Sequence, residues 1–251
     1  MNSDLSLILC GSLDKPSELW EILIHIRNTL DLIIAELDRL LKSNDGQISL
    51  YGSFIGRSIL ELGCTALIAR IDPFRVLLLR EVQRQPNYQI GTRNKISIQW
   101  QGDVLTPDSK PVHGLWADKD MERITRALVG DYYDHIFWRN AVSRLLDTVE
   151  TGRGGDWLDQ LREIGREGFC GWARQQLSDL YSSLSKGLHH EFVVPPGALF
   201  DRRTITDLIT DSLNVIASLG LALNSISHIP FVIPLEDALQ RYENLQKLEI
   251  S

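Results

Sequence analysis

The segment ISLYGSFIGRSILELGCTALIAR, residues 48–70, decides the fold of this chain. Before its final arginine its only charged residues are Arg57 and Glu61, and apolar residues occupy nearly every side of a helix drawn through it. A helix of this composition belongs in the interior of a protein. Its small residues would let neighbouring helices approach closely, at some cost in helix propensity: Gly52, Gly56 and Gly63. The segment therefore predicts a buried central helix.

The rest of the chain is dominated by helical patterns. Over about 17–43, leucine and isoleucine recur by four and three residues, a narrow seam that requires a long helical partner. Further helices are predicted over about 73–85, 118–150 with a break at Gly130-Asp131, 156–188 in two pieces, 204–228, and from 234 onward. The fold class is thus mainly α, with long helices bundled around the central one in a single domain, residues 1–251.

Residues 86–117 interrupt the helical pattern. Glycine and proline punctuate this polar stretch, and Lys95 to Trp100 alternates in the manner of a strand. A long connection of this kind is usually a functional loop or a disordered one. It predicts an irregular insert, either a small β-hairpin or a flexible lid.

Composition narrows the class of protein. A net charge of −7 and a pI near 5.4 argue against a surface that binds nucleic acid generally, although a local basic face remains compatible. The three cysteines show no metal-binding spacing, so neither a metal nor a cofactor is expected. The N-terminus lacks the pattern of a signal peptide, and the apolar stretch 212–231 is interpreted as a core helix rather than a membrane span. We expect a cytoplasmic protein.

One candidate site lies on the predicted central helix. Arg57 and Glu61 are four residues apart and share a helical face with Phe54, Cys64 and Ile68, which predicts that the pair is buried. Buried charges need partners. Two interpretations follow, an internal ion pair that fixes helix register and a polar active-site or ligand pocket inside the bundle.

A second constellation lies near the end of the helix predicted over 156–188. Ser185 and His189 continue a helical stripe that begins at Ser178 and Ser182. A histidine near a helix C-terminus is favoured in its protonated form and is suited to proton transfer near neutral pH. The alternative is a solvent-facing or capping histidine beside serines that permit close packing.

Basic residues suggest a third possibility, contact with phosphate groups. Arg75 and Arg80 belong to a locally basic stretch that runs from Arg70 to Lys95. Together with Ser185 and His190 they are the candidate contacts for a ligand or RNA. The competing interpretation is a solvated helix face beside a loop.

Three motifs follow one another along the chain: an Arg-x3-Glu helix (Arg57 to Glu61), a shorter helix that begins with Asp-Pro, and a helix end with Ser-x3-His (Ser185 to His189). This arrangement resembles uncharacterised bacterial helical proteins related to the HEPN superfamily. Some of these are linked to antiviral defence. The resemblance covers chiefly residues 48–80 and 175–192. It implies a core of long helices, frequent dimerisation and, in some members, metal-independent RNA cleavage. A ribonuclease of this kind would require Arg57, Glu61 and His189 of this chain to converge.

The chain departs from the catalytic members of that superfamily, in which an arginine precedes a histidine by four to six residues on one helix. No arginine here precedes a histidine at that interval, and Lys186 before His190 offers only a lysine, which does not replace arginine at a phosphate clamp. Three hypotheses remain. The first is a helical interaction or scaffold protein that binds a protein partner or a second copy through its long helices, as part of a bacterial antiphage defence system. The second is a divergent HEPN-type ribonuclease. The third is a sensor of nucleotides or other ligands.

Overall fold

The structure is a computed structural model that describes residues 3–86, 88–89, 128–130, 133–188 and 200–248. The described residues form helices and no strand, which confirms the mainly α prediction. The elements are α1 (Asp4–Cys10), α2 (Glu18–Leu41), α3 (Asp45–Ile71), α4 (Pro73–Gln83), the π-helical turn η2 (Asp134–Trp138), α7 (Arg139–Thr148), α8 (Gly155–Lys186), α9 (Arg202–Asn224) and α10 (Leu235–Gln246). The predicted insert at 86–117 lies, apart from residues 86, 88 and 89, outside the described part of the chain.

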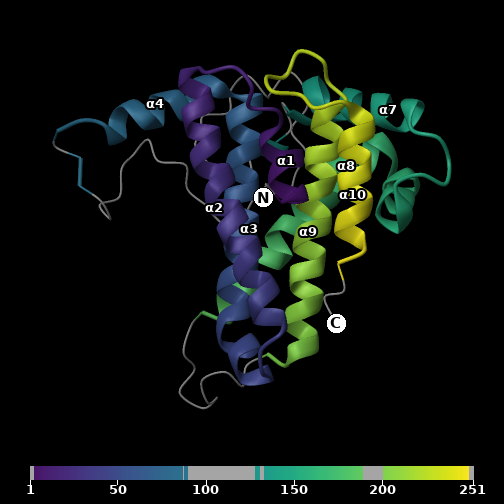
Figure 1. The fold of residues 1–251 in the computed structure, drawn as a ribbon. Coiled ribbons are helices and arrows are strands. Elements are labelled where there is room, and N and C mark those ends of the chain that lie inside the picture. The colour runs from purple at the N-terminus through teal and green to yellow at the C-terminus, as the bar shows by residue number, and fades with distance from the viewer. Residues whose placement is uncertain (1–2, 87, 90–127, 131–132, 189–199, 249–251) are drawn as a thin grey trace.

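The predicted central helix is α3. It packs against α2, α8 and α9 and also contacts α1 and α4, so helices surround much of its length (Figure 1). The seam predicted on α2 is buried against it. The glycines act as predicted: a Cβ built on Gly63 would lie 2.6 Å from the Ile216 side chain of α9, and one on Gly52 would overlap Ile205. Close contact between α3 and α9 therefore depends on these small residues.

The boundary between α2 and α3 differs in detail from the prediction. The side chain of Asn44 accepts a hydrogen bond from the backbone N–H of Gln47 at 3.0 Å and so caps the start of α3. Asparagine is among the preferred residues at a helix N-cap. α3 therefore starts at Asp45 rather than near Ile48.

A short N-terminal helix, α1, was not predicted. Its residues Leu5, Ile8 and Leu9 are fully buried between α2, α9 and α10. Seven residues with a brief apolar run give too little periodicity to identify a helix. Its position depends on tertiary contacts, above all those of Arg70.

Arg70 belongs to the core, which corrects its assignment to a basic surface segment. Its guanidinium donates to the carbonyl oxygens of Ile8 and Leu9 at the end of α1, at 3.1 and 3.0 Å. It also donates to the carbonyls of Pro230 and Phe231, and to Oδ1 of Asn224 at 3.0 Å. Five N–H donors thus meet five acceptors. Burial lowers the pKa of Arg70 to about 10, which leaves the side chain protonated at neutral pH.

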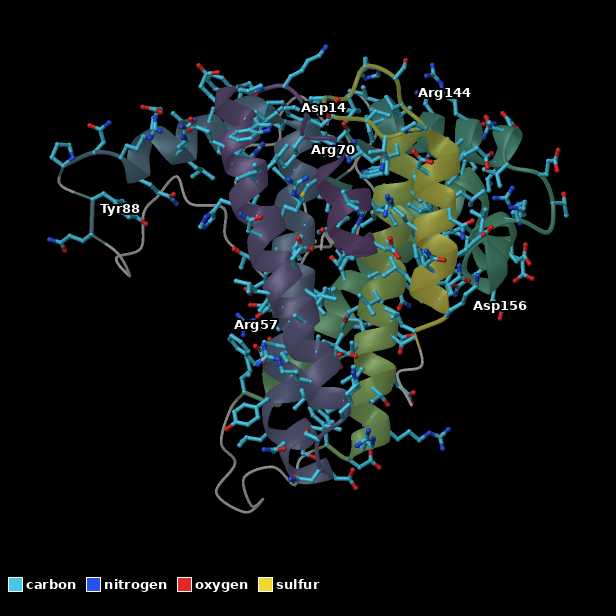
Figure 2. All side chains as sticks on the ribbon, in the orientation of Figure 1. Asp14, Arg57, Arg70, Tyr88, Arg144 and Asp156 are labelled. Atoms are coloured by element: carbon cyan, nitrogen blue, oxygen red, sulfur yellow. The ribbon has the colours of Figure 1, made fainter. Side chains whose placement is uncertain are left out.

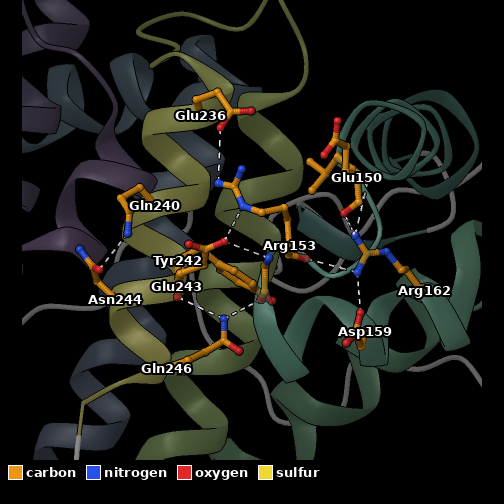
Figure 3. Close-up of polar contacts among 12 residues, drawn as sticks. Glu150, Arg153, Asp159, Arg162, Glu236, Gln240, Tyr242, Glu243, Asn244 and Gln246 are labelled. Carbon is orange, nitrogen blue, oxygen red and sulfur yellow. Dashed lines mark hydrogen bonds and ion pairs between the residues drawn. The ribbon is translucent and has the colours of Figure 1, made fainter.

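Side chains of α10 hold the glycine-rich segment before α8, residues 151–155, in place (Figure 3). Glu243 accepts hydrogen bonds from the backbone N–H of Gly154 at 3.0 Å and from Nε of Arg153 at 3.2 Å. Gln246 accepts from the backbone N–H of Trp157 at 3.1 Å, so α10 caps the N-terminus of α8. The predicted division of α8 is confirmed by non-helical backbone at Gly165.

The late apolar stretch forms the second half of α9. By length and composition α9 would be long enough to cross a membrane, but 72% of its most apolar window is buried inside the bundle. This burial confirms the interpretation of the stretch as a core helix, although α9 ends at Asn224, before the predicted end near His228.

Candidate functional site

The sequence-predicted pair Arg57 and Glu61 lies where α3 meets α8. Nε of Arg57 donates to Oε1 of Glu61 at 3.0 Å, and one terminal guanidinium nitrogen donates to the hydroxyl of Tyr181 at 2.6 Å. The guanidinium carbon also lies 4.6 Å from the centroid of the Tyr181 ring, within the range of a cation–π contact. Arg57 is therefore held by one carboxylate and one aromatic ring.

The prediction that this pair is buried was wrong. The side chains of Arg57 and Glu61 are 28% and 39% exposed, and Phe54 on the same face is 56% exposed. α1, α4, α7 and α10 gather around the upper half of the bundle, and in the lower half only α2, α8 and α9 pack against α3 in the described part of the chain. One face of α3 is left open there, and Figure 2 shows Arg57 at this outer edge, far below Arg70.

The serine stripe on α8 is only partly described. Ser185 lies one turn beyond Tyr181, and its hydroxyl oxygen is buried without a hydrogen-bond partner among the described residues, as is that of Ser53 on α3. A Cβ on Gly187 would overlap the Ser53 hydroxyl, so α3 and the end of α8 are in close contact here. The candidates His189 and His190 lie outside the described residues, and their relation to Arg57 stays a prediction.

The predicted ligand or RNA contacts Arg75 and Arg80 do not join this cluster. Nε of Arg75 pairs with the Asp72 carboxylate at 3.0 Å, at the start of α4. Arg80 pairs with Glu21 and donates to the carbonyl oxygen of Glu18 at 3.0 Å, which docks α4 onto α2. Both arginines already have intramolecular acceptors, and a role for them in binding RNA stays a prediction.

Exposed apolar side chains, missed by sequence reasoning, lie on α3 within two turns of Arg57. Of the eight large apolar side chains that are exposed in the described part of the chain, three lie on this part of α3: Leu50, Tyr51 and Phe54. With Arg57 they form what we call the α2–α3 surface. A groove of about 400 Å³ between the two helices runs beside it, lined by Tyr51, Phe54, Ile33 and Leu40 and by the ion pair of Glu36 with Arg39.

The described residues offer little for covalent or metal chemistry. They contain no group of three histidine, cysteine or acidic side chains that would hold a metal. All three cysteines are buried free thiols, and burial raises the pKa of Cys10 to about 12 and those of Cys64 and Cys170 well above the usual value. Thiols with raised pKa values are poor nucleophiles at neutral pH.

In comparisons with known proteins, no family model, curated protein or solved structure matches the chain. Membership of the HEPN-related proteins therefore stays a prediction, carried by the Arg57–Glu61 and Ser185–His189 motifs alone.

Proposed function

We propose that the protein is a helical interaction protein that binds a second copy of itself through the α2–α3 surface. The observation that carries this proposal is the group of exposed apolar side chains on α3 beside Arg57. Aromatic residues and arginine are enriched in protein interfaces and supply most of the residues that dominate binding energy. Phe54, Tyr51 and Arg57 are of these types and sit on one open helix face.

The charges beside the groove favour a second copy as the partner. Glu36 and Arg39 lie three residues apart on α2 and form an ion pair at 2.9 Å. In a twofold dimer the same patch meets itself, so Glu36 of each copy can face Arg39 of the other. The apolar side chains then pack together at the centre, and the polar pair lies at the rim.

The contacts that hold the Arg57 side chain in place also suit a protein interface. A side chain that is already held by Tyr181 and Glu61 loses less conformational entropy when a partner covers it. Three exposed apolar side chains make up only part of a standard interface of about 1,600 Å², so we expect a dissociation constant on the order of 10 µM. Within this proposal, the HEPN resemblance suggests that the protein works in the cytoplasm as one component of a bacterial antiphage defence system.

Sedimentation equilibrium over about 1–200 µM protein tests the proposal. We expect a monomer–dimer equilibrium that Phe54→Glu and Tyr51→Glu abolish. Ile136→Glu is the matched control, because Ile136 is 63% exposed but lies on η2, away from the α2–α3 surface. A wild-type chain that is monomeric throughout this range, or an Ile136→Glu variant as defective as Phe54→Glu, would contradict the proposal.

A second candidate function is RNA cleavage of the HEPN type. One observation favours it: Arg57 contacts Tyr181 on α8, one turn before Ser185, the first residue of the predicted Ser185–His189 motif. Incubation of purified protein with single-stranded RNA in the presence of a chelator tests it. Cleavage that is lost in both Arg57→Ala and His189→Ala would support this function, and cleavage unchanged in these variants would point to a contaminating nuclease.

A further inference from the structure

A second groove, separate from the α2–α3 surface, lies where α4 packs against α2. It encloses about 520 Å³, and its apolar lining comes from Ile22 and Ile26 of α2 and from Val76 and Leu79 of α4. Thr65 of α3 also contributes to the lining. This volume is within the range of pockets that bind small organic molecules.

The lining of this α2–α4 groove also carries more arginine side chains than carboxylates. Arg80 and Arg84 both face Glu21, with guanidinium–carboxylate contacts that include 3.6 Å for Arg84. His25 is exposed at the same groove. Arg84 has a further acceptor in Glu81 at 3.3 Å, but Glu81 does not line the groove. Both pairs of Arg84 are more than half exposed, so each contributes little. Two arginines thus share one carboxylate in the groove.

We propose that the α2–α4 groove binds a small organic anion with an apolar body, its anionic head held by Arg84 and Arg80 and its tail lying along Ile22, Ile26 and Leu79. The apolar lining accounts for the tail, because removal of methylene groups from water is favourable. The arginines account for the head, since guanidinium groups form strong paired hydrogen bonds with carboxylates and phosphates. Glu21 occupies the arginines while the groove is empty and competes with the incoming head.

This competition makes a prediction that a merely structural role for the charges does not. Glu21→Gln removes the internal competitor and leaves both arginines in place, so it should tighten binding of the anion several-fold. Arg84→Gln should weaken binding about tenfold. If the three charges served only to dock α4 onto α2, both substitutions would loosen the groove and weaken binding together.

Isothermal titration with octanoate and with octyl phosphate, and with 1-octanol as the uncharged counterpart, tests the proposal and distinguishes the two head groups. We expect binding of at least one anion in preference to octanol, tightened by Glu21→Gln and weakened by Arg84→Gln. Arg144→Gln on α7 is the control and should bind as the wild type does, because Arg144 is exposed on a distant helix. Equal binding of octanol, absence of binding at millimolar ligand, or weakening by Glu21→Gln would overturn it.

Discussion

The hydroxyl of Tyr181 on α8 accepts a hydrogen bond of 2.6 Å from Arg57 on α3, and the guanidinium carbon of Arg57 lies 4.6 Å from the ring of the same tyrosine. This contact connects the two segments that the sequence singled out, the charged pair of the central helix and the polar stripe of α8. It does so at the surface of the bundle, where Arg57 is reachable by a partner molecule.

Arg57→Ala is expected to affect association more than folding. The arginine is partly exposed, and its ion pair and cation–π contact should together contribute no more than about 1 kcal/mol to the free energy of unfolding. Loss of an interface arginine should weaken the dimer about tenfold, or about 1.4 kcal/mol. Urea unfolding and sedimentation equilibrium of the same variant measure the two effects. Destabilisation by several kcal/mol with unchanged association would assign Arg57 a purely structural role.

Replacement of Arg70 should affect folding more than association. Arg70→Met fills similar space but leaves five buried acceptors without their donor, so we expect a loss of about 3 kcal/mol or more in urea unfolding. Hydrogen exchange of α1 should accelerate most, because Arg70 ties Ile8 and Leu9 to the core. A variant with wild-type stability would show that the five hydrogen bonds have no net effect.

Three glycine-to-alanine substitutions separate steric contact from backbone conformation. Gly63→Ala should destabilise by about 1–3 kcal/mol, because its Cβ meets the buried Ile216 at 2.6 Å. Gly165→Ala should also destabilise, by about 1–3 kcal/mol, because Gly165 has φ 66° and ψ 172°, a region essentially confined to glycine, although no atom lies near. Gly171→Ala is the control with neither restriction, and it should stabilise by about 0.5–1 kcal/mol. Thermal unfolding measures the change in stability of each of the three variants. Equal changes in all three would contradict this account.

Glu243 should make stability depend on pH in acid. Burial raises its pKa, but the hydrogen bond from Gly154 and the contacts with Arg153 outweigh burial, so the pKa lies below its usual value. Its contribution, about 1 kcal/mol, is therefore present at neutral pH and is lost as the pH falls below about 4 through the pKa of the folded state.

Glu243→Gln tests this linkage when urea unfolding is measured from pH 7 to pH 3. The variant should be less stable than the wild type at pH 7, and the two should converge in acid. Glu236→Gln is the control, because Glu236 also contacts Arg153 but is 76% exposed, and it should change little at any pH. A constant difference between Glu243→Gln and the wild type across this range would contradict the assignment.

Sequence patterning predicted the helices that bury continuous apolar stripes. The α2 seam, the central α3 and the core stretch of α9 each carry many repeats of the pattern, so no partner needs to be known to identify them. The kink of α8 also followed from local chemistry, because Gly165 adopts a conformation that glycine tolerates best.

The features that sequence patterning did not predict depend on which helices pack against one another. α1 is stabilised by Arg70, which is distant in sequence, and the composition near Arg70 indicates a basic surface rather than a core. Phe54 and Tyr51 look like core residues by type, and only the absence of a covering helix among the described residues leaves them exposed. The same gap in packing explains why the Arg57–Glu61 pair was predicted to be buried and is not.

The central claim is that two copies meet through the α2–α3 surface, and photo-crosslinking tests it most directly. A photoreactive phenylalanine analogue replaces Phe54 in a mixture of unlabelled and ¹⁵N-labelled chains, so that crosslinks between copies are recognised by mass. We predict crosslinks between unlabelled and labelled chains that map to residues of α2 and α3, and none when the analogue replaces Ile136. Crosslinks confined to single chains, or crosslinks between copies that map elsewhere, would contradict the claim.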